Sequence, residues 1–263
     1  FLGLATSYEL FLFFRVIEAL VVPAILTSLM SILANIDKEN IKFNMSIYVA
    51  STVFGGLVGR IFSGFIATNL SYEFVFYSLS LAILVSIYFI SKLSYEGEAT
   101  ISKPKITDVM EILKDKRFLI IYFLMFCVFF VFSGVLNILP FRVKEISSNV
   151  SEFQISLLYL GYGMGILISL NSSKIVKFFK NELNTILFGL IFFLFITIFL
   201  IQENIIFIFL LIFLFCVGMF TVHTVSTGLA NSMKESQKSL TSGMYLSFYY
   251  LGGALGSFLP SII

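Results

Sequence analysis

The segment FLIIYFLMFCVFFVFSGVLNILPF, residues 118–141, contains no charged side chain, and it decides the class of fold. A helix of about 20 apolar residues crosses the hydrocarbon core of a bilayer. Similar runs recur along the chain, at 9–34, 44–69, 74–93, 154–173, 183–202, 205–231 and 240–262. A shorter stub occupies residues 1–5. The runs do not alternate apolar and polar residues as barrel strands do, so we expect an all-α polytopic membrane protein with eight full spans.

The composition excludes several other classes of protein. Of the 263 residues, 59% are hydrophobic and 12% are charged, whereas about 25% are charged in ordinary soluble domains. This excludes a soluble enzyme, a nucleic-acid binder and a disordered chain. Cys127, Cys216 and the single His223 form no metal-ligand pattern, so we expect no metal and no cofactor. A phosphate-binding loop of the G-x-x-x-x-G-K-[ST] kind is missing too, which argues against transport driven by ATP.

The basic residues predict how the spans are oriented. Alternate loops carry most of the 17 Lys and Arg residues, whereas the opposite loops carry only Arg142 and Lys144. Short loops rich in Lys and Arg stay on the cytoplasmic side. We therefore expect the linker 94–117 to be cytoplasmic and the first full span to run from outside to inside.

The linker 94–117 contains a helix signal. Asp108 resembles an N-cap with Glu111 three residues later, and Val109, Ile112 and Leu113 share one face. We expect a short amphipathic helix on the inner membrane surface, with a plain solvated hinge as the alternative.

Two segments of the sequence repeat each other. YVASTVFGGLVG at 48–59 and YLSFYYLGGALG at 245–256 share one Tyr and three Gly residues, and Leu-Ala-Asn at 33–35 recurs at 229–231 with nearly the same offset. Parallel repeats related by an axis along the membrane normal are typical of secondary transporters. The repeat predicts a twelve-helix parent, of which this chain, starting at Phe1 within an apolar run, holds helices four to eleven.

The repeat also sets the expected domain boundaries. Residues 1–93 would be the end of an N-terminal six-helix half, with the stub of helix three and helices four to six. Residues 94–117 would be the linker, and residues 118–263 would be the C-terminal half with helices seven to eleven.

Several motifs resemble the major facilitator superfamily. FRVIEA at 14–19 is similar to its helix-four motif R-x-x-Q-G, and FGGLVGRIFSG at 54–64 is similar to its helix-five signature. SYEFVF at 71–76, YLG at 159–161, HTVSTG at 223–228 and YYLGG at 249–253 add weaker matches. The nearest branch is that of drug/proton antiporters and arabinose-efflux-type permeases, although the Gly-Pro of the antiporter motif is missing. The resemblance implies a helical bundle with two pseudo-symmetric halves, incomplete at both ends.

The resemblance also implies a function. We expect a monomeric multi-pass protein of the inner (cytoplasmic) membrane that exports small organic molecules in exchange for protons by alternating access. Its partners would be a small-molecule substrate, protons and the lipid bilayer, with no nucleic acid and no enzymatic chemistry. An uptake or symport carrier of the same fold and a truncated, non-transporting remnant are the alternatives. A membrane-embedded acyl- or glycosyltransferase is disfavoured because the outer loops carry few polar residues.

Polar residues inside spans are the candidate pathway residues. A charge at the membrane centre costs at least about 2.5–3.5 kcal/mol, so such residues normally face a cavity or a partner. The candidates for the substrate and proton pathway are Arg15, Glu18, Arg60, Asn137, Tyr159 and His223. We expect Arg15, Glu18 and Arg60 to share one layer, with Glu18 paired to Arg60 or Arg15. The alternatives are a purely structural ion pair and a His that only joins two helices.

Glycines mark the candidate gating surface. The family places the glycines of helices five and eleven against helices of the opposite half, which predicts a rocking interface. The candidates are Gly55, Gly56, Gly59, Gly64, Gly252, Gly253 and Gly256. Ordinary tight packing without a gating role is the alternative.

Overall fold

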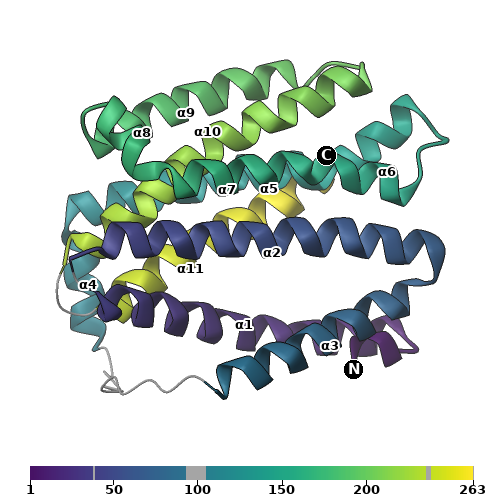
Figure 1. Cartoon of the computed structure of the whole chain (residues 1–263), viewed down its shortest axis with the longest axis horizontal. Coiled ribbons are helices and arrows are strands. Elements are labelled where there is room, and N and C mark those ends of the chain that lie inside the picture. Colours follow the sequence, from purple (N-terminus) through teal and green to yellow (C-terminus); the bar gives the residue numbers. More distant parts are fainter. Residues whose placement is uncertain (38, 93–104, 235–237, 263) are drawn as a thin grey trace.

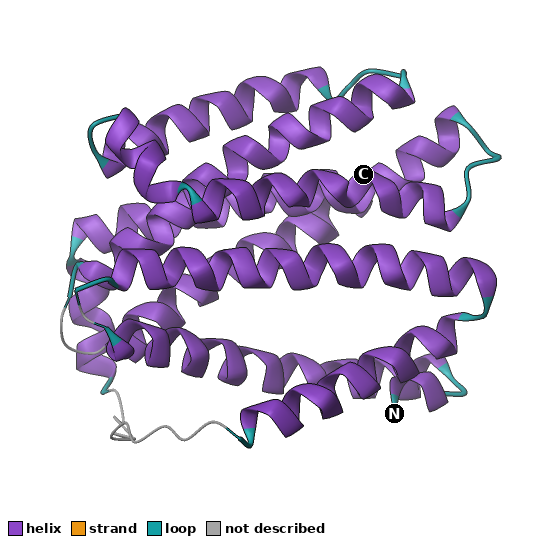
Figure 2. Cartoon of the chain, in the orientation of Figure 1, coloured by secondary structure: helices purple, strands orange, loops and turns teal. Residues whose placement is uncertain are grey.

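The computed structural model describes residues 1–37, 39–92, 105–234 and 238–262. Within these ranges the regular elements are helices, and Figure 2 shows no strand among them. Residues 94–104 of the expected linker, including Lys103, lie outside the described residues, as does Lys38.

The helices fall into two groups that follow one another along the chain. The N-terminal group contains α1 (Tyr8–Ile36), α2 (Ile41–Asn69) and α3 (Tyr72–Ile90), after a short 3₁₀ turn η1 (Leu2–Leu4). The C-terminal group contains α5 (Lys116–Ile146), α6 (Glu152–Leu157), η2 (Leu158–Tyr162), α7 (Gly163–Leu170), α8 (Ser172–Phe178), α9 (Glu182–Phe199), α10 (Ile205–Ser232), α11 (Lys238–Phe258) and η3 (Leu259–Ser261). The helix α4 (Ile106–Lys114) lies between the groups in sequence.

Among the described residues, seven helical stretches are long and apolar enough to cross a membrane, counting α6 to α7 as one stretch. They match seven of the eight expected spans and confirm a helical membrane bundle. The eighth expected span corresponds to α11, which lies outside this set and carries many Gly, Ser and Tyr residues. The stub expected at 1–5 is the turn η1, and the Tyr77 hydroxyl donates to the Gly3 carbonyl oxygen at 3.0 Å.

The loops are sorted to two ends of the bundle. The adjoining ends of α1 and α2, of α8 and α9, and of α10 and α11 lie at the left in Figure 1, together with α4. The connections α2–α3, α5–α6 and α9–α10 lie at the right. The loops that the charge pattern assigns to opposite sides of a membrane are thus at opposite ends, and which end is cytoplasmic stays a prediction.

Most of the buried core belongs to the C-terminal group. In the most apolar 18-residue stretch of α10, 56% of the residues are buried, whereas in the corresponding stretches of α1 and α3 the buried shares are 6% and 0%. α9 packs along α10 and α11 packs along α5. The packing is close because small residues face the neighbouring backbone: a Cβ added at Gly218 of α10 would lie 2.7 Å from the Phe193 Cα of α9. α10 is therefore the central helix.

The glycines of α11 correct one expectation. A Cβ added at Gly252 or Gly256 would strike the backbone carbonyl oxygen of Phe126 or Phe130, and one added at Gly253 would strike the Phe129 ring. These glycines lie on the face of α11 that meets α5. Because α5 belongs to the same group, the expected contact of Gly252, Gly253 and Gly256 with the opposite half is wrong.

The linker helix α4 also differs from expectation in detail. It begins at Ile106, and Asp108 lies in its first turn, where the carboxylate accepts from the Lys105 backbone N–H at 3.0 Å. Ile112 is only 1% exposed, and Val109 and Leu113 pack against the core. The apolar face is therefore covered by protein, which leaves it unavailable to the membrane surface.

The two groups meet along a seam formed by α1 and α2 on one side. α2 packs against α6, α7 and α10, and α1 packs against α11. Two polar contacts cross the seam at the end that carries the basic loops. Lys42 of α2 forms an ion pair with Glu182 of α9, and the buried Lys238 Nζ donates to the Ala34 carbonyl oxygen at 2.8 Å.

Candidate functional site

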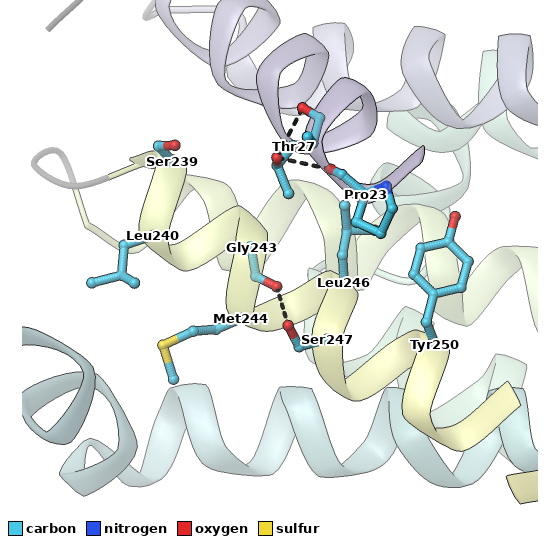
Figure 3. Close-up of a pocket in the computed structure, with 10 residues that line it drawn as sticks. Pro23, Thr27, Ser239, Leu240, Gly243, Met244, Leu246, Ser247 and Tyr250 are labelled. Atoms are coloured by element: carbon cyan, nitrogen blue, oxygen red, sulfur yellow. Dashed lines mark hydrogen bonds between the residues drawn. The ribbon is translucent and has the colours of Figure 1, made fainter. Parts of the chain in front are cut away.

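A pocket of about 460 Å³ lies on the seam between α1 and α11 (Figure 3). Three of its lining residues come from α1: Pro23, Ala24 and Thr27. The others come from α11 and its first turn: Ser239, Leu240, Gly243, Met244, Leu246, Ser247 and Tyr250. Residues three or four apart share one face of a helix, and this spacing directs a single face of α11 toward α1. The pocket is therefore shared by the two groups.

The pocket lining is uncharged and rich in hydroxyl groups. The Thr27 hydroxyl donates to the Pro23 carbonyl oxygen at 2.9 Å, and the Ser247 hydroxyl donates to the Gly243 carbonyl oxygen at 2.9 Å (Figure 3). Each hydroxyl thus uses its proton within its own helix, and its oxygen lone pairs remain to accept hydrogen bonds. Such a lining suits a small molecule with apolar and donor groups.

A buried polar network lies on the other face of α11, against α10. His223 Nδ1 and the Tyr245 hydroxyl are 2.9 Å apart. The Thr227 hydroxyl lies 2.9 Å from the Tyr245 hydroxyl and 2.7 Å from the His223 carbonyl oxygen. His223 is 7% exposed and Tyr245 is fully buried. The network continues along α10 to Asn231, whose amide N–H donates to the Thr227 carbonyl oxygen and whose side-chain oxygen accepts from Ser242.

Stacked rings connect the network to the pocket. The Tyr249 ring stacks on His223 with centroids 4.7 Å apart, and Tyr250 meets Tyr249 edge-on at 5.1 Å. Tyr250 lines the pocket. The neighbouring Tyr122 of α5 donates to the Thr241 carbonyl oxygen at 3.1 Å and fixes α11 against α5. A movement of α11 would therefore disturb the pocket and the His223 network together.

The charges of the N-terminal group separate into two places. Arg15 and Glu18 form an ion pair at 2.8 Å within α1, and the Arg15 guanidinium lies over the Phe11 and Phe76 rings. Arg60 of α2 instead lies over the rings of Tyr159 and Tyr162, at 5.3 and 4.7 Å. Of the two pairings expected for Glu18, the structure contains the one with Arg15.

The remaining predicted residues are dispersed. Asn137 lies on an exposed part of α5, and the Tyr159 hydroxyl donates to the Leu136 carbonyl oxygen at 3.0 Å. Gly64 is a contact between the groups, because an added Cβ would lie 2.6 Å from the Ser156 side chain of α6. Gly55 and Gly59 face open space, and Gly56 has only the Arg60 side chain nearby.

Sequence reasoning missed the tyrosines that surround His223. Tyr245 and Tyr48 are the matched tyrosines of the two repeated segments, and both are buried. This match was the available signal, since a Tyr kept in both copies suggests a buried position. In the described part of the chain, no three His, Cys, Asp or Glu residues are grouped so as to hold a metal ion.

These features define a polytopic helical membrane protein with a pocket and a buried polar network at the seam between two helix groups. The family model described as Major Facilitator Superfamily matches residues 1–257. The chain belongs to this superfamily, which confirms the resemblance of its motifs.

Two curated relatives are similar over nearly the whole chain. An "uncharacterized transporter" of Buchnera aphidicola subsp. Schizaphis graminum is 23% identical over 261 residues, covering 96% of this chain and 62% of the relative. Another of Buchnera aphidicola subsp. Baizongia pistaciae is 22% identical over 262 residues, covering 95% of this chain and 63% of the relative. The chain thus spans less than two thirds of the length of either relative. The family and these names point to a transporter rather than an enzyme.

Proposed function

We propose that the whole protein is a secondary transporter of the inner membrane that exports small organic molecules in exchange for protons and works as a monomer. The observation that carries this proposal is the seam pocket, which α1 and α11 line from opposite sides. Rocking of one helix group against the other would expose such a pocket first to one side of the membrane and then to the other. No covalent change of the substrate is involved.

The contacts at one end of the seam would act as a gate between the two helix groups. The Lys42–Glu182 ion pair and the hydrogen bond from Lys238 to Ala34 join the groups beside the basic loops. Both must break for the seam to open at that end. An exposed ion pair is worth only about 0–1 kcal/mol, so modest differences in substrate binding can break the Lys42–Glu182 pair.

The His223 network supports the proton-coupled part of the proposal. In one arrangement Tyr245 donates to His223 Nδ1 and Thr227 donates to Tyr245. In the other, His223 Nδ1–H donates to Tyr245, whose proton turns to the His223 carbonyl oxygen at 3.3 Å. Both satisfy the same oxygen and nitrogen atoms without moving them. When Nε2 keeps its proton in the second arrangement, the imidazole holds one proton more than in the first, so the network can take up or release a proton without moving these atoms. Imidazole titrates near neutral pH when it gains access to water.

An uptake carrier of the same fold is the second candidate, because the Gly-Pro of the antiporter motif is missing from the helix-five segment. The direction of the proton gradient separates the two. The full-length protein would be reconstituted in liposomes, and a panel of radiolabelled sugars, amino acids and organic acids would be tested for flux. An antiporter accumulates solute toward the more acidic side, whereas a proton symporter accumulates it toward the more alkaline side. Solute movement that ignores the pH gradient in both directions would contradict proton coupling.

A further inference from the structure

A second cavity, of about 700 Å³, lies on the seam beside α2, α3 and α6. The N-terminal group contributes Arg60 and several glycines of α2, among them Gly55 and Gly59, together with Val75 and Leu79 of α3. The C-terminal group contributes Pro140, Glu152, Ile155, Ser156 and Tyr159. Both groups therefore line this cavity, as they line the pocket between α1 and α11. Unlike the uncharged lining of that pocket, the lining of this cavity includes a cation, Arg60.

The Arg60 guanidinium is positioned but largely unused. It lies over the Tyr159 and Tyr162 rings of the C-terminal group, and Nη1 donates to the Gly56 carbonyl oxygen at 3.1 Å. A guanidinium carries five N–H donors in a planar fork. Most of its donors are therefore available to a ligand, while the rings hold its plane in place.

The charge of Arg60 is unmatched within the described part of the chain. No described carboxylate forms an ion pair with Arg60. Glu18, the partner expected from the sequence, is paired with Arg15 at 2.8 Å instead. Glu152, the acidic residue of the cavity lining, is paired with Lys144 at 2.6 Å. The cavity therefore keeps a net positive charge in a membrane-spanning helix, where an unpaired cation is costly.

The platform under Arg60 is rigid. Tyr159 and Tyr162 stand on η2, a 3₁₀ turn between α6 and α7, which a close approach to α10 fixes: a Cβ added at Gly161 would lie 2.9 Å from the Ile212 carbonyl oxygen. Gly55 and Gly59 of α2 line the same cavity, and a Cβ added at either would meet nothing within 4 Å. The glycines therefore leave room in the cavity for a planar group beside the guanidinium.

We propose that this cavity binds a small planar organic carboxylate, with its two oxygens on the Arg60 guanidinium and its apolar part between Tyr159 and the glycines of α2. Arg and a carboxylate form two parallel N–H···O bonds, a match that a neutral ligand lacks. The carboxylate neutralises the unmatched charge and touches both helix groups at once. The inference rests on the proposed transport function in one respect: it makes this anion a transported solute.

The test uses benzoate as the probe and benzamide as its neutral isostere, with the purified full-length protein. Binding is measured by thermal shift and by calorimetry. We expect benzoate to bind and benzamide to bind at least about tenfold more weakly, since charged hydrogen bonds are worth that factor or more. Arg60→Gln should lose benzoate binding by a similar factor. Arg117→Gln is the matched control, because it makes the same change of charge at an arginine that does not line the cavity, and it should bind benzoate like the wild type.

Other outcomes are equally decisive. If Arg60→Gln does not fold by size-exclusion chromatography, Arg60→Lys keeps the charge without the fork and should still weaken benzoate binding several-fold. Equal binding of benzoate by all variants overturns the proposal, as does no benzoate binding by the wild type. A phospholipid retained in native mass spectra of the wild type but lost from Arg60→Gln, with no benzoate binding, assigns the cation to a lipid phosphate and also overturns it. None of these results depends on flux, so a failure here leaves pH-driven transport separately testable.

Discussion

Substituting Gly218 by Ala should loosen the centre of the bundle. An added Cβ would lie 2.7 Å from the Phe193 Cα and 2.8 Å from its backbone N, whereas carbon atoms in contact sit about 3.5–4.0 Å apart. Because these neighbours are backbone atoms, they cannot rotate away, and α9 and α10 must separate by roughly 1 Å. A gap of that size forfeits about a quarter to a half of the dispersion energy along the contact.

The expected loss of stability follows from these terms. Overpacking of a core typically costs about 1–3 kcal/mol, and the rigid backbone neighbour argues for the upper end. The exchange of Gly for Ala in a helix returns about 1 kcal/mol. The net loss is about 2 kcal/mol, which corresponds to a fall in Tm of roughly 4–8 °C for a chain of this size.

Thermal unfolding of the purified full-length protein in detergent measures this difference. Gly163→Ala is the matched control, since its added Cβ has only the Leu57 side chain nearby, at 3.8 Å. Its Tm should stay the same or rise slightly. A Gly218→Ala protein as stable as the Gly163→Ala protein would refute the close approach of α9 and α10.

Three further predictions follow from the fold and the charges. In a protein without Cys127 and Cys216, Lys144→Cys should react with an impermeant thiol reagent added outside intact cells and Lys177→Cys should not; labelling of Lys177→Cys would invert the topology. Lys42→Gln should shift the full-length carrier toward the state that is open beside the basic loops. This shift is measured as faster labelling of a cysteine at Ser173 with a permeant reagent, with Lys177→Gln as the control of equal charge change. Equal labelling rates in the two variants would exclude a gate at Lys42–Glu182. Glu18→Gln should leave pH-driven transport intact if the Arg15–Glu18 pair is only structural, whereas loss of the pH dependence in a folded variant would assign coupling to Glu18.

The sequence predicts the helices better than it predicts their contacts. Apolar runs such as 118–141 and 205–231 correspond to α5 and α10 because a bilayer requires helices of that length. The glycine pattern of α11 did not reveal that Gly252 and Gly256 face α5, since spacing gives a shared helix face but not the partner of that face. The N-cap of α4 was misplaced by three residues: Lys105 occupies it, and Asp108 accepts the Lys105 backbone N–H from within the first turn.

The candidate site was only partly visible in the sequence. His223 stood out as a titratable residue in an apolar span, but its partners Tyr245 and Tyr249 come from another helix and required the packing of α10 on α11. Charge alone predicts that Arg60 forms an ion pair with a carboxylate. The aromatic platform formed by Tyr159 and Tyr162 depends on the contact of α2 with η2, which spacing within one helix cannot indicate.

The central claim, that the His223 network couples protons to transport, is tested most directly by comparing two kinds of flux in one reconstituted variant. Full-length His223→Gln, shown to fold like the wild type, would be assayed for solute accumulation driven by a pH gradient and for solute exchange without a gradient. We predict that pH-driven accumulation is lost while exchange persists, because the seam pocket between α1 and α11 is intact. Accumulation that persists in His223→Gln with the same dependence on pH would contradict it.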